Sequence, residues 1–521
     1  MGFSMQTKLK VSELLEQVKE FDQAGSFLQL LDAVNILLLK DPNNSEYVLY
    51  KLKALDGLGK VSSDIKLLEH YVNMRSTDST GFILLYQAYL EKKDTAGALI
   101  ALSYALSVNP DDEQCMVLLL ELLKKVDPKY KRVKINILTL KRIGHLSSEI
   151  EPLMRKVKGQ DEQDCLYLFV SNTPESCNSY LLSLLKNISH IVVAPFWYQL
   201  YVSRPTLLDD FFFADFPYDL NCSLRGKSNI DINTQGFKNL VSIYEDYPKC
   251  TEIPPSDENK AWQILSALGI KKLDKIVCLH VRDSAYLSSI TNGGDFSYHD
   301  FRDAKIESYK QAVEYLISQG YKVVRIGANT NQNLEIDDPN YFDFCLQRDQ
   351  VHGDLLEVFI LSVCQFFIAN FGGPYGVAAM LDTPTLVVNG VPIQHPYMKY
   401  GRFIPKRLFQ DESEVNLLDV CAGKPLSEDN NAPIYLSFNS AVFEQYGYHY
   451  IENTEDEILQ AVVEFERMVE NRILNMTLTE KQIAYFNALP EDFCHRNKCV
   501  ITDSFLTAHE HTFKPSASFA E

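Results

Sequence analysis

An arginine and a histidine stand at the end of one apolar, β-prone segment, where they could bind an anion. The run KIVCL at 275–279 predicts a buried strand, and His280 and Arg282 follow it directly. Side chains alternate along a strand, so these two are expected on the same side of its tip. An arginine can donate two parallel hydrogen bonds to a diphosphate, and a neighbouring histidine can add another. A structural ion pair between Arg282 and Asp283, or another acid, would explain the same spacing, so both interpretations stay open.

A glycine-rich turn follows a second apolar segment in the same half of the chain. The run QFFIAN at 365–370 predicts a strand, and a turn and a helix come after it. Glycines at such a turn let backbone N–H groups and the helix N-terminus point at an anion. One such turn is a weak signal, but two strand-end features in one lobe strengthen each other. The turn comprises Phe371, Gly372, Gly373, Pro374, Tyr375 and Gly376.

A histidine and a glutamate one helical turn apart form the third candidate site. The run KINILTL at 134–140 predicts a strand, and Gly144 and His145 open the helix after it. Glu149 follows His145 at i+4, so the two side chains can form a polar pair on one helix face. Such a pair, placed over a cleft, could take a proton from an acceptor. A lone histidine is also often structural, and that interpretation remains open.

The first part of the chain reads as a series of helices. Apolar residues recur at three- and four-residue spacing from 8 to about 126, with short polar breaks between the runs. Pro42 and Pro110 lie 68 residues apart (110 − 42), which is twice the tetratricopeptide period of about 34 residues. The pattern predicts about three degenerate repeats, and a generic helical bundle is the alternative. The residues at the expected packing positions are Leu85, Tyr89, Ala98 and Ala105.

From residue 131 onward, short β-prone runs alternate with helical segments, which predicts parallel sheets covered on both faces. Two Rossmann-like α/β lobes are expected, preceded by the all-α repeat domain. The expected strands lie at 134–140, 165–171, 190–196, 275–281, 321–327, 365–371 and 383–389. The predicted division is a repeat domain at 1–128, a first lobe at 129–254, a second lobe at 255–450, and C-terminal helices at 451–521 that pack back on the first lobe.

The overall charge restricts the partners. Lys and Arg number 50 against 69 Asp and Glu, which gives a net charge of −19. A surface this negative repels phosphate backbones, so nucleic acid is not expected as a partner. A local basic pocket for one small anion is still compatible with this charge. The repeats are expected to offer a surface to a protein partner.

The cysteines and the ends of the chain carry little functional signal. Most of the 11 cysteines lie in apolar segments, as reduced core residues do. Cys494, Cys499, His509 and His511 do not fit the spacing of a zinc module, so neither a metal nor a cofactor is expected. The N-terminus lacks a signal-peptide pattern and no apolar run is long enough to span a membrane, so we expect a cytoplasmic protein, or one at the periphery of the inner membrane.

Several ordered motifs across 134–510 resemble a family of predicted bacterial surface-polysaccharide glycosyltransferases. They are RIGHLSSEIE, HVRDSAYL, DLLEVFILSVCQFFIANFGGPYG, TPTLVVNGVP, FIPKRL, YIENTEDEIL and ITDSFL. The second lobe is more distantly similar to α1,6-fucosyltransferases and protein O-fucosyltransferases. Their His-Val-Arg motif, which binds the diphosphate of GDP-fucose, matches His280, Val281 and Arg282. Their Thr-Phe-Ser-Ser turn, which meets the nucleotide, matches Asn370, Phe371, Gly372 and Gly373.

The chain departs from the fucosyltransferase pattern in two ways. Glycines replace the two serines of the turn, which leaves only backbone N–H groups, and Asp283 stands where those enzymes have a second arginine. The second departure predicts a less positive donor pocket, and together they leave the base and the sugar open.

The resemblance implies a GT-B-like glycosyltransferase with the nucleotide-sugar donor, a GDP-sugar first, on the second lobe. A glycan or protein acceptor would lie on the first lobe. Metal is not required if Arg282 and His280 balance the leaving diphosphate. His145, Glu149 or Asp283 could take the acceptor proton if the reaction inverts, and a retaining reaction requires no such base. The alternatives are an inactive scaffold with a transferase fold, favoured by the glycines at 372 and 373, and a sugar-nucleotide epimerase.

Overall fold

The computed structural model describes most of the chain, and it divides into two compact units. One, here called the repeat unit, comprises Met1–Ile137, Glu162–Pro174 and His190–Asp215. The other, the large-sheet unit, comprises Leu138–Asp161, Glu175–Ser189 and Phe216–Glu521. The residues that the structure describes are 10–160, 163–212, 240–285, 297–328, 330–346, 348, 352–393, 398–436, 439–474, 478–489 and 499–514.

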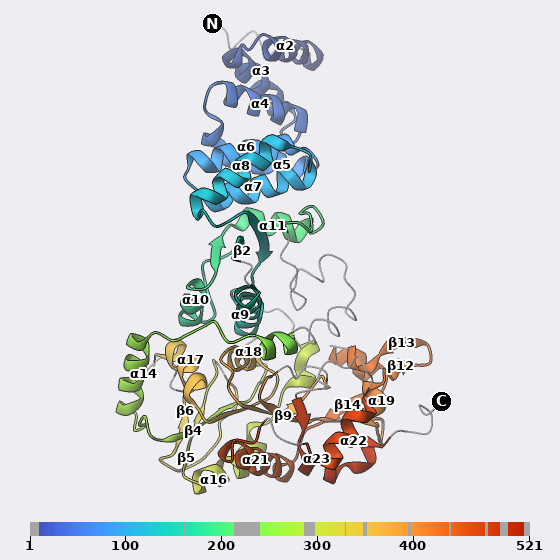
Figure 1. The fold of residues 1–521 in the computed structure, drawn as a ribbon. Helices are drawn as coiled ribbons and strands as arrows, with labels where there is room; N and C mark the ends of the chain where they lie inside the picture. The colour runs from blue at the N-terminus through green and yellow to red at the C-terminus, as the bar shows by residue number, and fades with distance from the viewer. Residues whose placement is uncertain are drawn as a thin grey trace. The chain divides into compact units, whose positions relative to one another are not determined.

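Helices follow one another through the N-terminal part of the repeat unit (Figure 1). Their order is α2 (Val11–Gln23), α3 (Phe27–Lys40), α4 (Ser45–Gly57), η1 (Val61–Asp64), α5 (Ile65–Met74), α6 (Ser79–Glu91), α7 (Thr95–Val108) and α8 (Glu113–Val126). The four residues at the expected repeat-packing positions, from Leu85 to Ala105, are all buried. The predicted helical N-terminal region is confirmed.

Helix N-cap residues recur with the repeat period, including in the repeat that lacks its proline. Asn44 caps α4, Asp78 caps α6 and Asp112 caps α8, each by accepting backbone N–H groups of the first turn. These caps follow one another by 34 residues (78 − 44 = 112 − 78 = 34). The middle repeat lacks its proline, yet Asp78 marks the start of its helix, because an N-cap satisfies backbone donors that the helix itself cannot.

A small parallel sheet completes the repeat unit. Its strands β1 (Arg132–Ile137), β2 (Cys165–Ser171) and β3 (His190–Val193) pair in that order, and helix α11 (Pro195–Ser203) follows. Trp197 of α11 is buried and stacks on Tyr104 of α7 with ring centroids 5.3 Å apart. The Asp209 N–H also donates to the Ser107 hydroxyl, at 2.9 Å. The repeats and the residues after β3 therefore share one core, which lies on both sides of the predicted boundary at 128.

The large-sheet unit contains a seven-stranded parallel sheet with a Rossmann-like strand order. The order is β15-β9-β8-β7-β4-β5-β6, so the chain runs outward from β4 to one edge and then returns to β7 beside it. The order reverses between β4 and β7, and in open α/β sheets ligands bind outside the carboxyl ends of the strands at such a switch point. The strands are β4 (Lys275–His280), β5 (Tyr321–Arg325), β6 (Tyr341–Asp343), β7 (Phe366–Ala369), β8 (Thr385–Gly390), β9 (Gly401–Pro405) and β15 (Cys499–Ile501).

The helices of this unit are placed around the large sheet (Figure 1). They are α9 (Ile143–Gly159), α10 (Ser179–Lys186), α14 (Pro255–Ala267), α16 (Lys310–Ser318), α17 (Gly353–Val363), α18 (Gly373–Met380), α19 (Leu417–Cys421), α20 (Ser440–Gln445), α21 (Glu455–Glu470), α22 (Glu480–Ala488) and α23 (Asp503–Ala508). Antiparallel strands β10 (Arg407–Gln410), β11 (Ser413–Glu414) and β14 (Tyr448–Ile451) form a further small sheet, and β12 (Pro425–Ser427) pairs with β13 (Asn430–Pro433). Short 3₁₀ helices lie at η2 (Ser297–Arg302), η3 (Ile306–Tyr309), η4 (Ile434–Leu436) and η5 (Glu510–Phe513).

The C-terminal helix α21 lies within the large-sheet unit. Its neighbours include α16, α23 and the strands β8 and β9, and its apolar face is fully buried. The expected packing of the C-terminal helices on the first lobe stays a prediction, as do the three predicted domain boundaries. None of the helices in the described ranges is long and apolar enough to cross a membrane.

Helices α9 and α18 pack closely because both carry glycines at their contact. A Cβ atom on Gly373 would lie 2.3 Å from Ile143 Cγ2, and one on Gly376 would lie 2.6 Å from Ser147 Oγ. Gly144 faces the Gly373 backbone, where a Cβ would lie 3.3 Å from its Cα atom. Substitution of any of these glycines would push the two helix N-termini apart, so the glycines set the spacing of the site that both helices reach.

Arg155 fixes the same two helices further along. Its side chain is fully buried and donates to Glu151 Oε1 at 2.6 Å, to Asp382 Oδ1 at 2.9 Å and to the Met380 carbonyl at 2.5 Å. The carbonyl belongs to the last residue of α18, whose carbonyls lack intrahelical partners. Burial raises the pKa of Glu151 to about 7, although Arg155 acts in the opposite direction.

Candidate functional site

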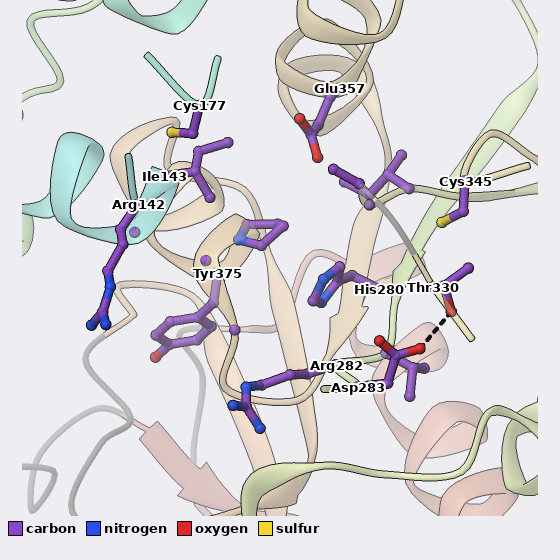
Figure 2. Close-up of a pocket in the computed structure, with 18 of the residues that line it drawn as sticks. Arg142, Ile143, Cys177, His280, Arg282, Asp283, Thr330, Cys345, Glu357 and Tyr375 are labelled. Atoms are coloured by element: carbon purple, nitrogen blue, oxygen red, sulfur yellow. Dashed lines mark hydrogen bonds between the residues drawn. The ribbon is translucent and has the colours of Figure 1, made fainter. Parts of the chain in front are cut away.

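Five arginines line a cavity of about 220 Å³ at the switch point of the large sheet, and Figure 2 labels two of them, Arg142 and Arg282. They come from the N-cap of α9, the loop after β4, η2, the end of β5 and the loop before α17, and are Arg142, Arg282, Arg302, Arg325 and Arg348. Two carboxylates, Asp283 and Glu357, also line this space, here called the arginine cavity. Arginines thus outnumber carboxylates in the lining, although Arg282, Arg325 and Arg348 also pair with Asp303, Asp343 and Asp354. That Asp283 makes the donor pocket less positive than the pocket of the fucosyltransferases stays a prediction.

His280 occupies the tip of β4 in the neutral form. Burial, with help from nearby arginines, lowers the pKa of its imidazole to about 4. Its Nδ1 atom is buried and has no hydrogen-bond partner among the residues that the structure describes. A Cβ on Gly372 would lie 2.7 Å from its Cε1 atom, so the lack of a side chain at Gly372 leaves room for this ring. A neutral imidazole can both donate and accept one hydrogen bond in the cavity.

Arg282 is held by two contacts. Its backbone N–H donates to Asn370 Oδ1 at 2.7 Å, and its guanidinium pairs with Asp303. The sequence left open an ion pair with Asp283 or another acid, and the acid is Asp303. Burial raises the pKa of Asp303 to about 6, against the opposing effect of Arg282. Arg282 also lines the cavity.

Asp283 anchors a loop. One of its carboxylate oxygens accepts from the Ala285 N–H at 3.0 Å. The other accepts from Thr330 Oγ1 at 2.6 Å, the dashed line in Figure 2, and from the Asn331 N–H at 2.9 Å. These three bonds use much of the capacity of the carboxylate, so Asp283 is poorly suited to be a base.

The predicted glycine-rich turn lies at the cavity, but its residues have different tasks. Asn370 is fully buried and links Arg282 to the Arg302 carbonyl, to which its Nδ2 donates at 3.1 Å. Gly376 packs against α9. Helix α18 begins after Gly372 without a side-chain cap, and α9 begins after Arg142 in the same way. The first residues of both helices line the cavity, so two helix N-termini, each with a partial positive charge, meet there.

His145 and Glu149 form the expected pair. His145 Nδ1 lies 2.8 Å from Glu149 Oε1, with the histidine about one-third exposed and the glutamate almost fully buried. Burial raises the pKa of Glu149, and its hydrogen bond to His145 opposes that shift. His145 lines the arginine cavity, whereas Glu149 lies behind it. With Nδ1 turned to the carboxylate, Nε2 is the ring nitrogen left to act on a substrate.

The structure brings together most of the predicted site. His145, His280, Arg282, Asp283, Phe371, Gly372, Gly373 and Tyr375 line the cavity. Glu149, Asn370 and Gly376 support it from behind. Residues 286 and 287, which end the HVRDSAYL motif, lie outside the described residues. The roles given to all these residues stay predictions.

Sequence reasoning missed the opposite end of the cavity. Glu357 of α17 points into the cavity from above in Figure 2, and accepts from Asn178 Nδ2 at 3.1 Å and Arg348 at 3.2 Å. Arg325 ends β5, donating to Asp343 at 2.9 Å. Arg325 could have been found, because the rule that singled out Arg282 applies to every strand end. Arg348 and Glu357 carry no comparable signal.

Among the residues in the described ranges, no group of three or more histidine, cysteine or acidic side chains is arranged to hold a metal. Cys494, one of the four residues weighed as metal ligands, lies outside these ranges.

Comparison with known proteins gives weak structural similarity. No family model matches the sequence, and no curated protein matches it significantly. A family 9 glycosyl transferase from Veillonella parvula is 13% identical with a TM-score of 0.36, over 66% of this chain and 98% of that one. The ADP-heptose lipopolysaccharide heptosyltransferase II of E. coli is 12% identical with a TM-score of 0.36, over 65% and 99%. A Thermobaculum terrenum O-GlcNAc transferase is 13% identical with a TM-score of 0.24, over 98% of both chains. Scores of this size carry no functional argument, so the function is inferred from the site.

Proposed function

We propose that the protein is a glycosyltransferase that takes a sugar from a nucleoside-diphosphate sugar. The observation that carries the proposal is the arginine cavity, which gathers five arginines and two uncapped helix N-termini at the switch point of the large sheet. Guanidinium groups and helix N-termini both favour a diphosphate over a neutral ligand. The sequence resemblance described above supports a sugar as the transferred group, and GDP-sugars as the first donors to test.

The diphosphate would bind at the end of the cavity formed by His280, Arg282 and the turn at Gly372. The glycosidic bond to the diphosphate breaks with its electron pair passing to the phosphate oxygen, so negative charge grows there in the transition state. Fixed donors placed at such a charge stabilise the transition state more than the ground state. Neutral His280 can donate one hydrogen bond without competing for a proton.

The acceptor hydroxyl would lose its proton to His145. Glu149 holds Nδ1, which orients the ring and stabilises the imidazolium that forms when Nε2 takes the proton. With this base the acceptor oxygen attacks opposite the leaving diphosphate, and the anomeric configuration inverts. Because Asp283 is engaged by its loop, we assign the base to His145 rather than to Asp283.

We further propose that transfer does not require a divalent metal. The positive charge of the arginines can balance the leaving diphosphate, a role that Mg²⁺ or Mn²⁺ plays elsewhere through carboxylate ligands. Transfer should persist after EDTA treatment. Activity lost to EDTA and restored only by Mg²⁺ or Mn²⁺ would refute this part of the proposal.

The test of the main proposal is direct binding followed by turnover. GDP-, UDP-, ADP-, dTDP- and CMP-sugars are titrated into the full chain by calorimetry, and the strongest ligand is then incubated with candidate glycans or proteins. We expect a nucleoside-diphosphate sugar to bind, and its free nucleotide to appear only when acceptor is present. No binding by any of the five would contradict the proposal. Nucleotide release with a rearranged sugar and no acceptor would indicate an epimerase instead.

The scaffold alternative loses its main support. It was based on the glycines at 372 and 373, taken as lost functional residues. Both positions exclude a side chain, Gly372 because of His280 and Gly373 because of Ile143. The glycines are therefore explained by the construction of the cavity.

A further inference from the structure

A second cavity of about 770 Å³ lies in the large-sheet unit, next to the first. Residues of η2, α20 and β14 form most of its lining, together with Lys406. We call it the Lys406 cavity. Small-molecule sites usually measure about 300–1,000 Å³, so this space is large enough for an organic ligand. The proposed transfer uses none of these residues except Asp303.

Aromatic rings form one wall of the Lys406 cavity. Phe301 and Tyr450 stack with centroids 5.9 Å apart and planes 27° apart, and Phe443 meets each of them edge-on at 5.3 Å. Because each ring is held by the other two, the wall is fixed before any ligand arrives. A rigid aromatic wall provides apolar contact for the C–H face of a ligand at low entropic cost.

The charged groups of the Lys406 cavity are mainly carboxylates. Four carboxylates and two lysines line it. Lys406 is almost fully buried and donates to the carbonyls of Phe301 at 3.1 Å and Asp303 at 2.5 Å, and burial lowers its pKa to about 8. An ammonium group has three donors, so one remains beyond these two bonds. The carboxylates are Asp300, Asp303, Glu444 and Glu452.

The two cavities differ in charge and share a wall. Arginines dominate the first, whereas carboxylates outnumber lysines in the second, which disfavours an anion there. The wall between them includes the ion pair of Arg282 and Asp303, since Arg282 lines one cavity and Asp303 the other. A ligand in the Lys406 cavity therefore lies one ion pair away from the proposed diphosphate site.

We propose that the Lys406 cavity binds a neutral or amino-sugar unit of the acceptor glycan, beyond the unit that reacts. A sugar ring offers an apolar C–H face to the aromatic wall and several hydroxyls to the carboxylates and to Lys406. Hydroxyl groups donate well to carboxylates, and such bonds are stronger than neutral ones. An amino group on the sugar would gain further from the excess of carboxylates. That the bound sugar belongs to the acceptor rests on the proposed function, whereas saccharide binding in this cavity does not.

The test begins with a printed array of oligosaccharides probed with the full chain, followed by calorimetric titration of the strongest hit. The array carries neutral, amino-sugar and carboxylate-bearing oligosaccharides in matched lengths. We expect neutral or amino-sugar chains to bind, and carboxylate-bearing chains to bind more weakly than their neutral counterparts. No binding on the array, or a preference for the carboxylate-bearing chains, would overturn the proposal.

Two variants place the binding in this cavity. Phe301→Leu removes aromatic area at similar volume, and Glu444→Gln removes one exposed carboxylate without a change of shape. Each should weaken the titrated oligosaccharide about tenfold or more. Glu412→Gln, an exposed acid outside the cavity, is the matched control and should bind as the wild type does. Unchanged affinity in both cavity variants would refute the proposed location.

A donor-nucleotide titration of the same proteins separates the two proposals. Nucleotide affinity should change less than twofold in Phe301→Leu and Glu444→Gln. If the wild type binds the oligosaccharide but no nucleotide, the proposed transferase function fails while the saccharide site stands. If it binds nucleotide but no oligosaccharide, the reverse holds.

Discussion

Five helices of the repeat unit, α4 to α8, begin differently from the two helices at the arginine cavity. Helices α4 to α8 each start at an Asn or Asp whose side chain accepts a first-turn N–H group. Helices α9 and α18 start at Arg142 and Gly372, with no capping side chain. In α4 to α8 these side chains satisfy first-turn N–H groups, whereas no N-cap side chain does so in α9 and α18. Helices α2, α3 and α11 of the repeat unit also lack a side-chain cap bond, so the distinction applies to α4–α8 against the two cavity helices, and the predictions below test it.

The largest effect is expected for Arg282→Ala. The proposed pair is that of Arg282 with the donor diphosphate, and the loss of one partner in such a buried charge pair costs about 2–5 kcal/mol. Donor binding and transfer should therefore fall by roughly 30- to several-thousand-fold. Titration of the donor nucleotide and initial rates of transfer measure this, with circular dichroism to confirm folding. Arg467→Ala, at an exposed position on α21, is the control and should behave as wild type. Near-normal transfer by purified Arg282→Ala would remove the cavity from the mechanism.

His145→Gln should lower kcat by about 10²–10⁴-fold, the usual contribution of a general base. Donor affinity should change little, because the ring acts on the acceptor. Glu149→Gln should lower kcat less, and should shift the pH dependence of kcat, because the amide no longer stabilises the imidazolium. If the pair is purely structural, the two variants should instead have lower thermal stability, and the pH dependence of kcat should be unchanged.

Gly372→Ala should weaken donor binding about tenfold. The added methyl group would meet the His280 ring, and overpacking of this kind costs typically about 1–3 kcal/mol. Gly423→Ala is not a suitable control, because Gly423 has a positive φ of 90°. Ala422→Gly, next to it and away from the cavity, should leave nucleotide affinity unchanged. Wild-type affinity in Gly372→Ala would show that the ring can move aside.

Asp78→Ala should lower stability by about 1 kcal/mol through loss of an N-cap, and should leave donor affinity unchanged. Thermal unfolding gives the first quantity and nucleotide titration the second. This pairing is the converse of Arg282→Ala, which should change binding and leave the fold intact. A cap variant that also impairs nucleotide binding would contradict the distinction between capped and open helix ends.

The smallest effect concerns pH. The pKa of Asp303 is raised to about 6, so the folded chain holds its proton to higher pH than an unfolded chain does. Its contribution to stability is therefore present below the ordinary pKa of about 3.9 and declines as pH rises through 6. Protonation also releases Arg282, so donor affinity should rise by a few-fold from pH 7 to pH 5.5. The rise should be absent in Asp303→Asn, and a rise that persists there would assign it to another group.

Much of this architecture was predictable because it follows from local sequence patterns, namely apolar runs and helical spacing. The strand ends at His280 and at the turn after Asn370 were found from apolar runs, and parallel topology then required them to meet. The i+4 pair of His145 and Glu149 was predictable for the same reason, since helical geometry alone brings it together.

What the sequence could not provide depends on packing between distant segments. Asp303, rather than Asp283, pairs with Arg282 because the chain after η2 lies beside the end of β4. No sequence periodicity predicts that contact. Gly373 suggested an anion-binding turn, but its closest constraint is the side chain of Ile143. Trp197 belongs with the repeats through its stack on Tyr104, although 93 residues separate them (197 − 104). A truncation near residue 129 would remove Tyr104 and expose the Trp197 ring.

The N-caps Asn44, Asp78 and Asp112 follow one another by 34 residues, so the repeat array has a fixed step length. Removal of residues 44–77 would join the chain to Asp78 in the phase that Asn44 now occupies, with a competent cap at the start of the next helix. A deletion whose length is not a multiple of 34 would shift the caps and the buried positions out of this phase. Length changes in this part of the molecule are therefore tolerated in whole steps, so the array can be shortened or extended without redesign of the large sheet and its cavities.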